Sequence, residues 1–192
     1  LLITVQDDVP ADGTGTERGY VEEEALGGGN QDTNDVSGIN NTDGDTNNII
    51  WQGSLSGLFS VGTDAPGSYG LGTNTGSLPV LSSNHETVSY AVSGNVLTAY
   101  VDNGTTAGYQ EAEDRSVFTL TITDTESGSY TFTLKDQLDH SADGNTEGLL
   151  DLDLSGVIVR YDEDGDHATA GSGSLLITVQ DDVPADGTGT ER

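Results

Sequence analysis

The sequence predicts an all-β protein: a single antiparallel β-sandwich with Ig-like or Greek-key connections and short linker segments on either side. Two observations support this prediction. The apolar residues gather in short runs of β-branched and aromatic residues, several of which alternate with Thr or Ser. Helical periodicity is nearly absent, and Gly, of which there are 27, recurs every few residues. A chain of 192 residues has the length of one such domain.

Two pairs of runs predict hairpins. Residues 116–124 (SVFTLTITD) and 129–134 (SYTFTL) alternate apolar residues with Thr, and a Gly-containing turn separates them. Residues 87–92 and 96–101 form the second expected hairpin, with its turn at Ser93-Gly94-Asn95. Further strands are expected at residues 53–61, 149–154, 156–161 and 172–179, with the first strand beginning near residues 19–22.

The charge and composition of the chain exclude several kinds of partner and of chemistry. There are 33 acidic and 5 basic residues, which gives a net charge of −28, and there is no Cys or Met. A field of this sign repels phosphates, so neither nucleic acid nor an anionic membrane surface is an expected partner. Without Cys, disulfides and thiol chemistry are excluded. No apolar run approaches the roughly 18 residues of a membrane span and no leader pattern is evident, so we expect a soluble chain without membrane insertion.

Low hydrophobicity (32%) with high charge is also the composition of disordered chains, but the concentrated apolar runs favour a folded domain. The repulsion among so many carboxylates must then be relieved, and either bound cations or high external salt can do this. Carboxylates are the abundant side-chain ligand here, and the hard cation that they suit best is Ca²⁺. We therefore expect several calcium ions as cofactors.

An exact repeat gives the domain organisation. Residues 1–18, LLITVQDDVPADGTGTER, recur letter for letter at residues 175–192. This identity predicts a tandem array in which neighbouring identical repeats are partners in the same chain; an appended segment is the alternative. Residues 1–18 are then the last strand and linker of the preceding repeat. Residues 19–182 are the sandwich domain, and residues 183–192 are the linker to the next repeat.

The segment after the strand at 156–161 is the strongest candidate for metal binding. Asp162, Asp164 and Asp166 occupy alternate positions, and Gly165 permits a sharp turn among them. This spacing predicts a calcium loop between strands, unlike an EF-hand; a solvated acidic turn is the alternative. Asp43 and Asp45 have the same D-G-D core within residues 27–48, which are expected to form a long loop.

The linker is the second candidate. Asp7 and Asp8, repeated as Asp181 and Asp182, lie where one unit ends, and three glutamates open the next. On an alternating strand Glu22 and Glu24 would share one face, where an ion could remove their repulsion and stiffen the joint. Asp124 and Asp136, at the ends of two central strands, are expected to complete such sites from the same edge of the sandwich. A merely polar rim is the alternative.

The sequence does not indicate an enzyme. Neither a nucleophile elbow (GxSxG) nor a phosphate loop with its Lys is present. Asp139, His140 and Asp143 resemble parts of a site, but a His beside Asp in a turn is more often a hydrogen-bonding loop residue. Paired carboxylates for glycoside hydrolysis would need aromatic walls, and the chain has one Trp and three Phe.

Together, these motifs resemble those of tandem repeats from giant RTX adhesins, which are calcium-dependent bacterial surface proteins exported by type I secretion. The resemblance rests on the acidic loop at residues 162–166, the terminal strand LLITVQ, the DDxP linker and the segment TFTLKDQLDH (131–140). DDxP linkers also occur in cadherin-like domains. The nonapeptide of the calcium β-roll is absent, so the resemblance implies a sandwich repeat.

The resemblance implies a mechanical function: a secreted, cell-surface extender module that projects a ligand-binding tip and is held rigid by calcium. An isolated unit would be monomeric. The alternative is a ligand-binding module of the same kind of adhesin, which recognises carbohydrate or another surface through an exposed calcium loop. Identical tandem copies favour the extender, because a tip module is usually single.

Overall fold

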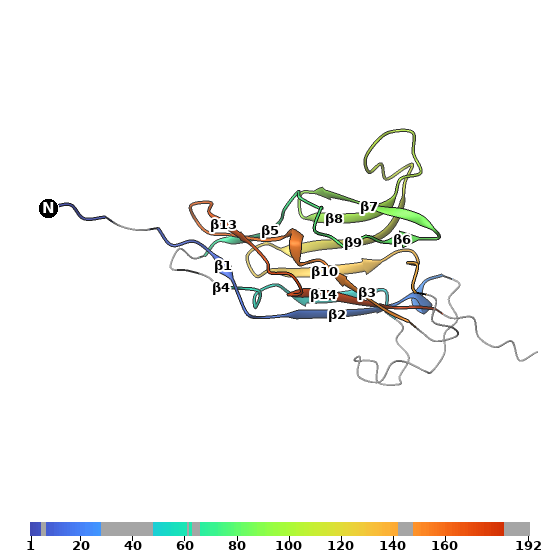
Figure 1. Ribbon diagram of the computed structural model, residues 1–192, viewed down its shortest axis with the longest axis horizontal. Helices are drawn as coiled ribbons and strands as arrows, with labels where there is room; N and C mark the ends of the chain where they lie inside the picture. The colour runs from blue at the N-terminus through green and yellow to red at the C-terminus, as the bar shows by residue number, and fades with distance from the viewer. Residues whose placement is uncertain (5–6, 28–47, 61, 63–65, 142–147, 183–192) are drawn as a thin grey trace, which may run out of the picture.

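A computed structural model describes residues 1–192 except 5–6, 28–47, 61, 63–65, 142–147 and 183–192 (Figure 1). In the described part, fourteen β-strands and two short 3₁₀ helices make up the regular structure, and there is no α-helix. The predicted all-β, sandwich-like fold is therefore confirmed. No helix in this part is long and apolar enough to cross a membrane.

The largest sheet has six strands in the order β3-β10-β9-β8-β7-β6. Strands β6 to β10 follow one another in the chain, and each pairs with the next in an antiparallel direction. Four of the five pairings in this sheet are therefore between strands that are consecutive in the sequence. The strands are β3 (Ile50–Ser54), β6 (Ser82–Ser83), β7 (Glu86–Ser93), β8 (Val96–Val101), β9 (Arg115–Asp124) and β10 (Ser129–Leu134).

Three smaller sheets complete the fold: β11-β14-β2, β13-β12-β5 and the pair β1-β4. Their strands are β1 (Ala11–Asp12), β2 (Glu17–Glu22), β4 (Phe59–Ser60), β5 (Ser68–Leu71), β11 (Leu149–Asp153), β12 (Ile158–Tyr161), β13 (His167–Thr169) and β14 (Leu175–Gln180). One pairing departs from the predicted antiparallel architecture: β14 and β2 are parallel, with Gln180 opposite Glu22. Most of the chain separates these two strands, so no hairpin imposes an antiparallel direction.

The sheets enclose one hydrophobic core. Phe118 and Phe132 on neighbouring central strands are fully buried, with ring centroids 5.0 Å apart. Leu152 and Ile177 from the β11-β14-β2 sheet are also fully buried in the same cluster. Burying such side chains contributes roughly 1.5–3 kcal/mol each, which lets a weakly hydrophobic chain fold.

Both predicted hairpins are confirmed, as β9–β10 and β7–β8. The strand expected at residues 53–61 is wrong in its bounds: β3 ends at Ser54 and β4 begins at Phe59, with Leu55 buried between them. The short strands β1, β5, β6 and β13 were not predicted. Of these, β6 is joined to β7 by a turn in which Asn84 (φ 52°) and His85 (φ 64°) adopt the left-handed conformation of a two-residue hairpin.

The two copies of LLITVQ have different environments. In the second copy, which is β14, Leu175 and Ile177 are 0% exposed between β11 and β2. In the first copy, Leu1 and Ile3 are 117% and 75% exposed, and residues 1–4 form no strand. Residues 1–4 of the first copy lie away from the folded part at one end of the long axis (Figure 1).

The linker that follows the first copy packs against the domain. Pro10 is buried, and β1 pairs with β4. The Asp12 carboxylate accepts a hydrogen bond of 2.9 Å from the Gly171 N–H beyond β13. Residues 10–12 are therefore fixed at this end of the domain by backbone pairing and by a side chain.

Candidate functional site

The predicted calcium loop connects β12 to β13. The Gly165 N–H donates to Asp162 Oδ1 at 3.0 Å, and the Asp162 N–H donates to the Asp166 carbonyl at 3.0 Å. Gly165 has φ +101°, a conformation that favours glycine, so the expected sharp turn is confirmed. The turn presents the carboxylates of Asp164 and Asp166 to solvent at the end of the domain.

A third carboxylate joins them from the linker. Carboxylate oxygens of Asp7, Asp164 and Asp166 lie within 4.8 Å of one another, and all three residues are exposed. We call these three residues the loop cluster. Two segments that the sequence indicated separately, the D-G-D turn and the linker, are thus brought together. Asp8 follows Asp7 in the chain but is not part of the loop cluster; its carboxylate lies next to Gly62.

Negative charge is concentrated in the loop cluster. A hydrogen bond with Asp162 raises the pKa of the Asp164 carboxyl, and the charges of Asp162 and Asp7 raise it further. Asp162 Oδ2 is buried without a hydrogen-bond partner in the described part of the structure. A hard cation would relieve this repulsion, and oxygen ligands of this kind are those that Ca²⁺ takes.

The other predicted linker residues lie at the end of β2 and β14. The expectation that Glu22 and Glu24 share one face of a strand is wrong, because β2 ends at Glu22 and Glu23–Ala25 form a 3₁₀ helix. All three glutamates are buried. A carboxylate of Asp181, a carboxylate of Glu23 and a ring nitrogen of His140 lie within 4.8 Å of one another. We call these three residues the histidine cluster; Asp182 follows directly and is partly exposed.

Asp124 and Asp136 are not brought together. In the antiparallel β9–β10 hairpin, Asp124 lies at the turn and Asp136 follows the opposite end of β10. Asp124 accepts backbone hydrogen bonds from Glu126 and Ser127, and these lower the pKa of its carboxyl. Asp136 forms an ion pair of 2.5 Å with Arg115. The idea that both approach the linker from one edge is therefore wrong. Asp43 and Asp45 lie outside the described residues.

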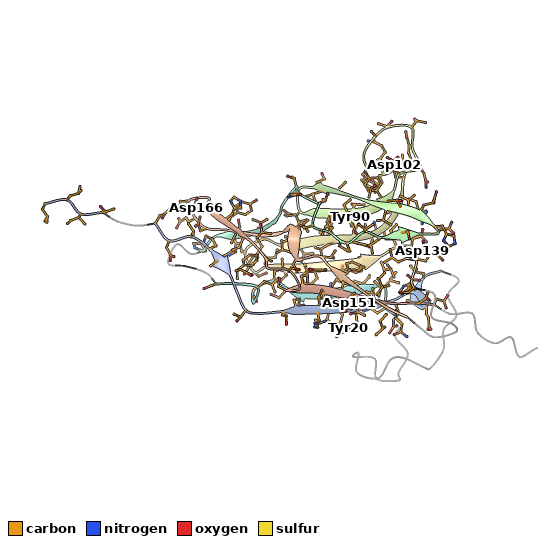
Figure 2. The ribbon with its side chains drawn as sticks, viewed as in Figure 1. Tyr20, Tyr90, Asp102, Asp139, Asp151 and Asp166 are labelled. Atoms are coloured by element: carbon orange, nitrogen blue, oxygen red, sulfur yellow. The ribbon has the colours of Figure 1, made fainter. Side chains whose placement is uncertain are left out.

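Figure 2 shows that the two clusters belong to opposite ends of the folded part, since Asp166 and Asp139 are labelled near its two ends. Asp139, the neighbour of His140, accepts a hydrogen bond of 2.9 Å from the His85 N–H. One end therefore carries the loop cluster beside the incoming linker, and the other carries the histidine cluster where β14 ends.

Sequence reasoning missed Glu23 and His140. The expectation that His140 is a hydrogen-bonding loop residue is confirmed, since it lies outside the strands and hydrogen-bonds to Glu23, but the burial of its side chain, which is only 4% exposed, was not expected. The sequence contained one signal that this segment is buried, the apolar residue Leu138. In the structure Leu138 is buried, and its N–H donates to the Glu23 carboxylate. The parallel register of β2 with β14, which sets Glu23 beside Asp181, has no short-range sequence signal.

A surface hollow lies beside the D-G-D turn. Its volume is about 640 Å³, and its lining includes Tyr161 and His167, which flank the turn, together with Asn74, Ser77 and Thr169. The Tyr161 and His167 rings are 5.5 Å apart. Asp153 also borders the hollow, but its carboxylate already accepts hydrogen bonds from Ser155, Ser172 and Gly173.

Comparison with known proteins gave one match. No curated protein and no solved structure matched the chain. A family model described as "Domain of unknown function (DUF5801)" matched residues 23–172, which is more than half of the chain and includes the strands from β3 to β13. The chain therefore belongs to the DUF5801 family.

Proposed function

We propose that this chain is one unit of a tandem array: a calcium-stabilised extender module of a bacterial RTX-type adhesin, which is exported by type I secretion and projects a ligand-binding tip from the cell surface. The observation that carries the proposal is the contrast between the two copies of LLITVQ. The same six residues form a central buried strand at one end of the chain and include exposed apolar side chains at the other.

The exposed copy has the sequence required for a strand of another unit. Leu1, Leu2 and Ile3 are 117%, 92% and 75% exposed. In an array these residues would be β14 of the preceding unit, between its β11 and its β2. Full burial of such side chains is worth roughly 1.5–3 kcal/mol each, so this arrangement removes an unfavourable exposure.

The repeat also defines the joint between units. Asp7 and Asp181 occupy the same position of the repeat. Asp181 lies with Glu23 and His140, and Asp7 lies with Asp164 and Asp166. In an array a single linker aspartate would therefore contact the histidine cluster of one unit and the loop cluster of the next. The linker would be held on both sides.

Calcium is the cation that we assign to the loop cluster. Its ligands are carboxylate oxygens at an exposed position, and weak sites of this kind, with Kd values of about 10⁻⁴–10⁻³ M, suit extracellular modules. Bound ions would offset a net charge of −28 and convert an acidic joint into a stiff one. The function needs no catalytic step, and we propose none.

Array length tests the extender function. We expect proteins of two, four and eight tandem units in calcium to be rods whose length, seen by electron microscopy, increases in proportion to the number of units. The physical reason is that each linker is fixed to the unit that follows it. Globular particles, or contour lengths that vary widely among molecules of one protein, would contradict an extender.

The hollow beside the D-G-D turn supports one second candidate, a carbohydrate-binding module. Its lining combines two aromatic rings, Tyr161 and His167, with several polar side chains, and it adjoins the loop cluster. This candidate predicts calcium-dependent binding on a glycan array that the Tyr161→Ala substitution reduces at least about 10-fold, with Tyr20→Ala as a control away from the hollow. The extender function predicts no glycan signal in either protein.

A further inference from the structure

The histidine cluster differs in chemistry from the loop cluster. Its three donor atoms are two carboxylate oxygens, from Glu23 and Asp181, and one imidazole nitrogen of His140, all within 4.8 Å of one another. The loop cluster offers oxygen atoms only. Ca²⁺ takes oxygen ligands, whereas imidazole nitrogen suits Zn²⁺, Cu²⁺, Ni²⁺ and Fe²⁺.

The fold itself assembles this cluster from two sheets. Strands β2 and β14 are parallel, and their last residues, Glu22 and Gln180, lie opposite each other. The residues that follow the two strands, Glu23 and Asp181, therefore lie side by side. His140 arrives from the segment that follows β10 in the six-stranded sheet. The backbone of Asp181 is fixed by a hydrogen bond of 2.9 Å to the Gly148 carbonyl, just before β11. A bound ion would therefore connect the two sheets at this end.

Burial makes the cluster more than an acidic surface patch. The side chains of His140 and Glu23 are each 4% exposed, with His140 Nε2 at 3.3 Å from Glu23 Oε1. The buried Leu138 N–H donates to the same Glu23 oxygen at 2.7 Å and orients it. Hydrogen bonds that orient a ligand in this way are typical of metal sites.

The surroundings of the histidine cluster are acidic. Glu22 and Glu24, on either side of Glu23, are 7% and 3% exposed, so three consecutive glutamates are buried. Burial raises the pKa of the Glu23 carboxyl, and the hydrogen bonds from His140 and Leu138 offset part of this rise. Buried carboxylates are stable when they are paired with positive charge or coordinate a metal, and an ion at the cluster would place positive charge next to Glu23.

We propose that Glu23, His140 and Asp181 bind a transition-metal dication of the zinc class, at a site separate from the calcium loop. Three protein ligands of the types found here, with a fourth position for water or for another carboxylate, match the four-coordinate geometry of Zn²⁺. The site would join the ends of β2 and β14 to the segment after β10, and it does not depend on the existence of an array.

Zinc titration of the 192-residue protein tests the site. Calorimetry in millimolar calcium should show one Zn²⁺ bound per chain, and Co²⁺ should give the strong visible absorption of a tetrahedral site. His140→Gln should weaken zinc binding at least about 100-fold, because loss even of a group that only orients a ligand costs about 10–100-fold. His85→Gln and His167→Gln are matched controls, since both residues lie outside the cluster, and they should bind zinc like the parent protein.

The result can overturn the proposal in three ways. Absence of zinc binding, retention of full affinity in His140→Gln, or displacement of zinc by an equal concentration of calcium would each do so. Glu23→Gln provides a second variant in case His140→Gln does not fold, and it should also lose affinity. A calcium-dependent melting temperature that is unchanged in these variants would keep the calcium proposal intact, so the two proposals fail separately.

Discussion

Calcium is expected to raise the melting temperature of the chelated protein by about 5–10 °C. A site with a Kd of about 10⁻⁴ M, in about 10 mM calcium, stabilises the folded state by about 2.7 kcal/mol. For a chain of this size each kcal/mol shifts the melting temperature by about 2–4 °C, so the loop cluster gives about 5–10 °C. Differential scanning calorimetry with calcium and with chelator measures the shift.

The loop cluster should account for most of this shift. In the double variant Asp164→Asn/Asp166→Asn the calcium response should be largely lost, because two of the three clustered carboxylates are removed. In chelator the same variant should be at least as stable as the parent, since its neighbours raise the pKa of Asp164 and so disfavour its charged form.

Two exposed glutamates outside both clusters provide a charge-matched control. Glu111 and Glu126 are exposed and belong to neither cluster, so Glu111→Gln/Glu126→Gln removes the same formal charge without touching a candidate ligand. This control should keep the full calcium response. A melting temperature that calcium leaves unchanged in the parent protein would refute the calcium part of the proposal, and an equal loss in both variants would show only a general charge effect.

The hairpins were predictable because their signals are local. Phe118, Leu120 and Ile122 alternate with Thr, and such alternation decides both the strand and its buried face. The D-G-D turn was predictable for the same reason, since Gly165 needs only its own neighbours to adopt φ +101°. In each case a few adjacent residues contain the whole physical cause.

The assembly of the clusters was not predictable. Glu23 lies beside Asp181 only because β2 and β14 run in parallel, and this pairing depends on how the whole chain folds. His140 is a loop residue, as expected, but its burial was not predictable, because it follows from the packing of this loop against Glu23 at the start of the 3₁₀ helix. Asp136 was expected to be a metal ligand, but Arg115, distant in sequence, forms an ion pair with it.

The joint between units determines whether the proposed array is rigid. In a two-unit protein the internal copy of residues 175–192 would supply β14 of the first unit, and its linker would dock on the second unit as residues 10–12 do here, through β1 and Asp12. The joint aspartate that corresponds to both Asp7 and Asp181 then contacts a cluster on each side. Exchanging this aspartate and the one after it for asparagine (Asp181→Asn/Asp182→Asn at the joint) should remove the ion and leave a flexible connection with both domains folded.

Small-angle X-ray scattering of the two-unit protein, with calcium and with chelator, tests this claim most directly. We expect an extended particle with one fixed interdomain angle in calcium, and a broad distribution of shapes both in chelator and in the joint variant in calcium. Near-ultraviolet circular dichroism checks that both domains stay folded in each sample. Equal flexibility of the parent protein in calcium and in chelator, with folded domains, would contradict an ion-stiffened joint.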